Sequence, residues 1–70
     1  MIVRAPLPGK IIRLYLKPHE YASKGQLLLT MESMKMTLPV HSPEAGEIVY
    51  EVGEGDIVMR GEIITRIFPS

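Results

Sequence analysis

The chain consists of short runs rich in Val, Ile and Leu that are separated by Gly and Pro at close spacing. Apolar residues that alternate with polar ones are typical of half-buried β-strands, and no stretch shows a sustained helical period between capping residues. The pattern therefore predicts an all-β protein. A chain of 70 residues fits one domain, residues 1–70, in which every element must contribute to one small core.

The turn residues and apolar positions of the first half recur in the second half. Residues 3–12 align with residues 40–49 and share Val, Pro, Gly and Ile, and residues 24–31 align with residues 60–67 once one residue is dropped from the second half. We therefore predict two half-repeats, at about residues 3–31 and 40–67. One such unit cannot bury its own apolar face. Two copies related by a pseudo-two-fold axis are expected to close into a small flattened β-barrel or sandwich.

A predicted hairpin, residues 31–38, lies between the two half-repeats. Apolar alternation favours an antiparallel register that keeps both apolar faces together, in which Met31 pairs with Leu38 and Leu29 with Val40. A slip by one residue would expose one of the two sets to solvent. This register leaves Met34 and Lys35 as the two turn residues.

Met34 and Lys35 are unusual residues for such a turn. Two-residue hairpin turns normally need positive φ, which pairs such as Asn-Gly supply. Met and Lys in these positions would cost on the order of 1–3 kcal/mol, and such strain tends to persist where a function uses it. We therefore expect Lys35 to be held at the tip for a purpose. Met31 is expected in the core, whereas Met34 and Met36 flank the tip and suit contact with a partner.

The sequence Glu-Ser-Met-Lys-Met at residues 32–36 resembles the Glu-Ala-Met-Lys-Met attachment sequence of biotinyl domains, the family of the biotin carboxyl carrier protein. The resemblance extends over residues 2–68 and includes Ala-Pro-Leu-Pro-Gly at residues 5–9 and Gly-Glu-Gly-Asp at residues 53–56. It implies a flattened β-barrel (a barrel-sandwich hybrid) of two four-stranded antiparallel sheets with pseudo-two-fold symmetry. The target lysine of such domains lies on the central hairpin.

The resemblance also implies a function. Lys35 would be the site of covalent biotin attachment by biotin protein ligase, and Glu32, Met34 and Met36 would be recognised by the ligase and other partners. The attached biotin would carry carboxyl groups between the biotin carboxylase and carboxyltransferase sites of a biotin-dependent carboxylase. The chain itself would be a carrier and not an enzyme, with no catalytic residues.

Two alternatives stay open. A lipoyl carrier domain, of a 2-oxoacid dehydrogenase or glycine cleavage type system, resembles a biotinyl domain in its fold and its hairpin lysine but usually has Asp-Lys-Ala at the tip. The second alternative is an unmodified barrel that serves as an assembly module.

The sequence also departs from the family at residues 18–20, where Pro-His-Glu replaces a Gly-Asp turn. We expect this loop to turn differently from its counterpart at residues 54–56.

The charged residues of the chain limit the classes of partner that it is expected to bind. Eight Lys and Arg balance eight Asp and Glu, so the basic excess typical of nucleic-acid-binding proteins is absent and no nucleic-acid partner is expected. Residues 1–36 hold six basic and two acidic side chains, and residues 37–70 hold two basic and six acidic ones. The two halves are therefore expected to present opposite charge to a partner.

The amino-acid composition also indicates whether a metal site is expected and where in the cell the protein is expected. The chain has no cysteine, and no residues have the spacing of metal ligands, so no metal site is expected. No apolar run approaches the length of a membrane span or has the form of a signal peptide. We therefore expect a cytoplasmic protein with no membrane partner.

Overall fold

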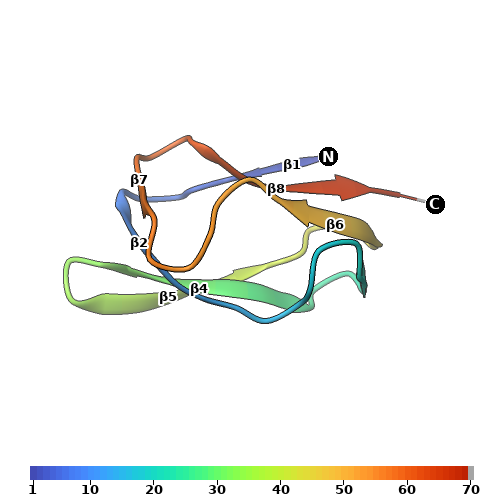
Figure 1. Cartoon of the computed structure of the whole chain (residues 1–70), viewed down its shortest axis with the longest axis horizontal. Coiled ribbons are helices and arrows are strands. Elements are labelled where there is room, and N and C mark those ends of the chain that lie inside the picture. The colour runs from blue at the N-terminus through green and yellow to red at the C-terminus, as the bar shows by residue number, and fades with distance from the viewer. Residues whose placement is uncertain (70) are drawn as a thin grey trace.

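The structure, a computed structural model, describes residues 1–69 and has two four-stranded antiparallel sheets in that range (Figure 1). The first sheet has the order β1 (Ile2–Arg4), β8 (Ile63–Phe68), β6 (Gly46–Tyr50) and β3 (Tyr21–Ala22). The second has the order β5 (Met36–His41), β4 (Leu27–Ser33), β2 (Gly9–Leu14) and β7 (Ile57–Val58). The molecule is elongated, 35 × 18 × 17 Å. The predicted all-β fold of two four-stranded sheets is confirmed.

Strands from the two halves of the chain alternate between the sheets. If each strand is replaced by the strand four places away in the chain, the order β1-β8-β6-β3 becomes β5-β4-β2-β7, which is the order of the other sheet. Each sheet thus contains two strands from each half, and its two central strands come from the same half. Neither half forms a sheet of its own.

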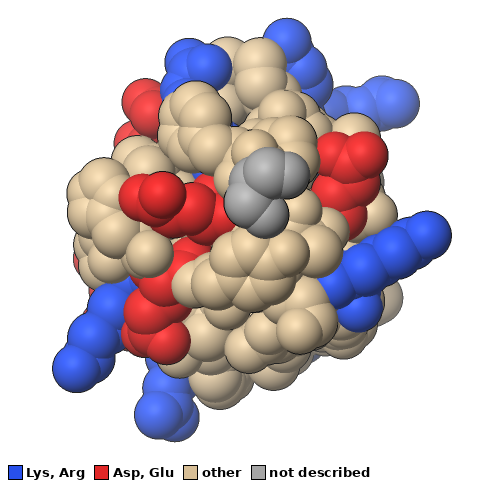
Figure 2. All heavy atoms as spheres, turned by 90° about the vertical axis from the view of Figure 1, so that its right-hand side faces the viewer, with Lys and Arg blue, Asp and Glu red and all other residues tan. Residues whose placement is uncertain are grey.

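The exchange of strands means that neither sheet represents one half of the chain, because each half contributes strands to both sheets. Figure 2 shows Lys and Arg next to Asp and Glu on the end of the molecule that carries the termini. Opposite charge on the surfaces that the two halves present to a partner stays a prediction.

The turns at residues 17–20 and 53–56 have the same geometry. In each, the carbonyl of the first residue accepts a hydrogen bond of 3.1 Å from the N–H of the fourth. The third residue has positive φ, 72° at His19 and 91° at Gly55. The carboxylate of the fourth residue accepts a bond from the first N–H, at 2.7 Å in the first turn and 2.8 Å in the second. The expectation that these loops turn differently is wrong, because His19 adopts the backbone conformation of Gly55.

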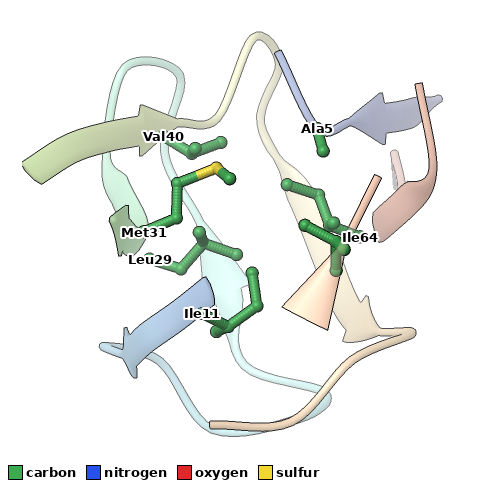
Figure 3. Close-up of a cluster of buried hydrophobic side chains, with 7 residues drawn as sticks. Ala5, Ile11, Leu29, Met31, Val40 and Ile64 are labelled. Atoms are coloured by element: carbon green, nitrogen blue, oxygen red, sulfur yellow. The ribbon is translucent and has the colours of Figure 1, made fainter. Parts of the chain in front are cut away.

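Two clusters of buried apolar side chains fill the space between the sheets. The larger consists of Ala5, Ile11, Leu29, Met31, Val40, Val58 and Ile64 (Figure 3). The smaller consists of Ala22, Leu28, Ile48 and Ile67. Val3 and Tyr50 pack against both clusters. Met31 is fully buried, which confirms its predicted place in the core.

Tyr50 adds a polar link within this core. Its hydroxyl donates to the carbonyl of Leu28 at 3.0 Å and accepts from the N–H of Leu16 at 3.3 Å. Burial raises the pKa of Tyr50, since the ionised phenolate would lose its water. The neutral hydroxyl therefore joins β6 to β4 and to the loop that follows β2.

Thr65 is a fully buried residue of β8 whose hydroxyl oxygen has no hydrogen-bond partner within residues 1–69. The repeat aligns Thr65 with Leu29 of β4, an apolar core residue. A buried hydroxyl without a partner costs about 1–3 kcal/mol. The core therefore contains one polar group that opposes folding.

Thr65→Val should raise the free energy of unfolding by about 1 kcal/mol, because it removes the unpaired hydroxyl and keeps the branched shape. Urea denaturation of the two proteins measures the difference. The matched control is Thr37→Val on the exposed edge strand β5, which should change stability by less than about 0.5 kcal/mol. Equal effects of the two substitutions would show that the Thr65 hydroxyl carries no penalty.

Candidate functional site

The β4–β5 hairpin projects beyond the rest of the barrel at one end, whereas the N-terminus and the end of β8 lie at the other (Figure 1). The strands of the hairpin pair Leu29 with Val40, Met31 with Leu38 and Ser33 with Met36. This confirms the predicted register. Met34 and Lys35 are the two residues of the turn, as predicted.

Both turn residues have a left-handed backbone conformation. The φ angle is 51° at Met34 and 65° at Lys35. Positive φ at both central residues defines the type I′ turn, which Asn-Gly forms with little strain. A residue with a Cβ atom loses about 1–2 kcal/mol in this conformation. The tip thus keeps two strained residues in succession. An unstrained Asn-Gly turn would lack the Met34 and Lys35 side chains.

The side chains at the tip are open to solvent. Met34 is 90% exposed and Met36 is 59% exposed, and Lys35 between them is also exposed. Within residues 1–69, the Lys35 amine takes part in no hydrogen bond or ion pair of the kind found elsewhere in the barrel. The site therefore offers a primary amine, free to move on its side chain, between two exposed thioethers.

Glu32 lies outside this group. It is on β4 two residues before the turn, where it pairs with Lys10 of β2 and Thr37 of β5. Its side chain is exposed. The structure thus brings Met34, Lys35 and Met36 together at the tip and places the Glu32 carboxylate further back along the hairpin.

Ser33 anchors the hairpin and was not among the predicted site residues. Its side chain points inward and is 5% exposed, and its hydroxyl donates to the carbonyl of Pro8 at 2.6 Å. Pro8 belongs to the loop between β1 and β2, so this bond ties the base of the turn to another part of the barrel. The alternation that places Leu29 and Met31 inward also places Ser33 inward, and a buried hydroxyl needs an acceptor. That signal was available in the sequence.

Three acidic residues of the second half, Glu47, Glu51 and Glu54, make contacts within the barrel. The Glu47 carboxylate lies 2.6 Å from Nδ1 of His19, and that of Glu51 accepts a bond of 3.0 Å from Nε of Arg66. The Glu54 carboxylate accepts a bond of 3.0 Å from the N–H of Leu14. These side chains act within the barrel and lie on its strands and turns.

Residues 1–69 contain no cluster of three or more acidic or histidine side chains arranged to bind a metal ion. The described part of the chain also has no cavity. In the same range, no helix is long and apolar enough to span a bilayer.

Comparison with known proteins gives a consistent result. Residues 2–67 match the family described as biotin-requiring enzyme. The chain is similar to the biotin/lipoyl attachment protein of Bacillus subtilis (strain 168), with 33% identity over 72 residues that cover 100% of this chain and 97% of that protein. It is also similar to the acetyl-CoA carboxylase of Dictyostelium discoideum, with 33% identity over 66 residues, or 94% of this chain and 3% of that protein.

Among solved structures, a single-chain, multi-domain long-chain acyl-CoA carboxylase matches the fold with a TM-score of 0.83 and 25% identity. The match covers 93% of this chain and 7% of that chain. The chain thus corresponds to nearly the whole length of one relative and to a small part of two large carboxylases.

The strain at the tip can be measured. Met34→Asn should raise the free energy of unfolding by roughly 0.5–1 kcal/mol, because Asn adopts positive φ more readily than Met. Chemical denaturation monitored by circular dichroism gives the difference. Met36→Asn is the control, since this residue lies in a strand, where Asn is disfavoured, and should bring no gain. A Met34→Asn variant that is less stable than the parent would contradict a strained turn.

Proposed function

Because the chain belongs to the family of biotin-requiring enzymes, we propose that it is a carrier domain that holds biotin covalently on Lys35. The chain is the attachment domain of such a system and is not itself catalytic, in keeping with its similarity to an attachment protein of nearly equal length. The observation that carries the proposal is the turn itself. Two strained residues hold a solvent-exposed amine at the far end of the barrel.

The residues at the tip fit covalent attachment of biotin. The Lys35 amine is exposed at a two-residue turn, so an enzyme can surround it without moving the barrel. A lysine amine is protonated near neutral pH and must lose a proton before it can act as a nucleophile. We assign this deprotonation to biotin protein ligase. Lys35 Nζ then forms an amide bond with the activated carboxyl carbon of biotin, and the activating group leaves.

The shape of the domain suits a carrier. When attached, biotin supplies a ureido nitrogen that takes up a carboxyl group at one active site and gives it up at another. We propose that the two sites are those of biotin carboxylase and carboxyltransferase. The hairpin projects at the end opposite the N-terminus (Figure 1), so Lys35 can enter an active site while the opposite end stays outside. Tethering also raises the local concentration of the carried group.

The residues around Lys35 are proposed to be recognised by the ligase. Met34 and Met36 present flexible apolar side chains on either side of the amine, and thioethers adapt well to a partner surface. Glu32 offers a carboxylate on the flank of the same hairpin. Together they give the ligase an apolar contact and a charged contact at different distances from the turn.

We further infer that residues 1–70 are one biotinyl domain built from half-repeats at about residues 3–31 and 40–67. The matching strand orders of the two sheets support this division. The two turns at residues 17–20 and 53–56, with equivalent hydrogen bonds, support it independently.

A lipoyl carrier is the alternative from the same fold, and an unmodified assembly module is the other. The Met-Lys-Met sequence at residues 34–36 favours biotin over the Asp-Lys-Ala that is usual in lipoyl domains. An assembly module would gain nothing from two strained residues that expose an amine.

Incubation with biotin protein ligase, biotin and ATP should add one biotinyl group to the chain, and Lys35→Arg should abolish the addition. Intact-mass spectrometry counts the groups, and peptide mapping locates them. Lys10→Arg is the matched control, because Lys10 is exposed on β2 near the same hairpin and its loss should leave the addition complete. A biotinyl group on the Lys35→Arg chain, or addition only by a lipoyl ligase, would refute the proposal.

A further inference from the structure

We propose that Met34 and Met36 form a peroxide-sensitive modification site, at which oxidation of the thioethers to sulfoxides prevents biotinylation of Lys35. This inference rests on the proposed function and deepens it, because it states how the same site is regulated. The oxidant is a small peroxide, such as hydrogen peroxide. Three observations carry it: the exposure of the two sulfurs, their position beside the amine, and their separation from the core.

Exposure distinguishes the methionines of the hairpin. Met34 is 90% exposed and Met36 is 59% exposed, whereas Met31 on the same hairpin has no exposed surface. Oxidation of methionine follows access of the oxidant to the sulfur. Peroxide should therefore modify the two methionines at the tip, together with the exposed Met1 and Met59 outside the hairpin, and leave Met31 unchanged.

Peroxide is the only co-reactant that oxidation of the thioether requires. The thioether sulfur attacks one peroxide oxygen, so that an S–O bond forms while the O–O bond breaks. The sulfur loses two electrons and becomes a sulfoxide. Each peroxide oxygen is reduced by one electron; the other oxygen takes the electron pair of the broken O–O bond and both peroxide protons, and leaves as water. The product is reversible, because methionine sulfoxide reductases restore the thioether.

The modification changes the recognition surface without disturbing the fold. Neither Met34 nor Met36 belongs to the two buried clusters, so a sulfoxide at either position removes no core contact. Each sulfoxide adds a polar oxygen beside Lys35 and converts an apolar surface into one that retains water. A partner that buries these side chains must then bury an oxygen without a matched donor, which is unfavourable.

Methionine has a property here that leucine would lack. Leu has a similar volume and is apolar, but it has no sulfur to oxidise. A tip that required only apolar contact could use either residue on both sides of Lys35. The chain has no cysteine, and of its exposed methionines Met34 and Met36 are the two that flank Lys35, so the attachment site is the place where oxidation of a methionine can act on recognition.

The experiment measures the initial rate of biotinylation before and after treatment with hydrogen peroxide, which is then removed with catalase. Peptide mapping should find sulfoxide at Met34 and Met36 and none at Met31. The rate should fall at least about tenfold, as expected when one polar group is buried without a partner. The thermal unfolding midpoint should stay unchanged. Treatment of the oxidised chain with methionine sulfoxide reductases should restore the rate.

Two variants separate the tip from other exposed methionines. The double variant Met34→Leu with Met36→Leu should keep its rate after peroxide. Met59→Leu, which removes an exposed methionine from the loop between β7 and β8, should lose its rate as the parent does.

An oxidised parent chain that is biotinylated at the untreated rate would overturn the inference, as would a fall that the reductases do not reverse. If the double variant is a poor ligase substrate, the reductase experiment on the parent chain decides alone. An untreated parent chain that takes no biotin is a failure of the proposed function and is recognised as such before peroxide is added.

Discussion

The apolar core forms only when the two halves of the chain exchange strands. Each half supplies four short strands, two to each sheet, and the larger buried cluster takes residues from both halves. A half by itself would leave its apolar face in water, since isolated strands of this length are not stable. The position of the hairpin follows from this exchange, because the chain crosses from one half to the other through β4 and β5.

The exchange of strands also allows the turn at the tip of the hairpin to sustain backbone strain. β4 is a central strand of its sheet and pairs with β2 on one side and β5 on the other. This pairing holds the base of the hairpin firmly, and the bond from Ser33 to Pro8 holds it against the loop between β1 and β2. A rigid base can sustain strain at Met34 and Lys35 that a free hairpin would relieve. The strained turn thus lowers the stability of the protein, and the strand pairing and packing of the barrel offset this loss.

Charge has a local role in this molecule. The carboxylates of Glu20 and Asp56 close equivalent turns, and Glu51, directly after β6, pairs with Arg66 of β8. Exposed pairs of this kind contribute little stability, but they fix the loops that connect the sheets. The tip itself has apolar neighbours around its amine, so recognition there is expected to depend on contact more than on long-range attraction.

The sequence by itself determined the all-β fold, the register of the hairpin and the two residues at its turn. It could do so because period-two alternation and turn residues are local properties, and a slip of one residue would expose an apolar face. The tertiary structure decided what depends on neighbours distant in the chain. Ser33 finds its acceptor in Pro8, and His19 adopts the conformation of Gly55. These outcomes follow from the packing of one half against the other, which pattern along the chain does not encode.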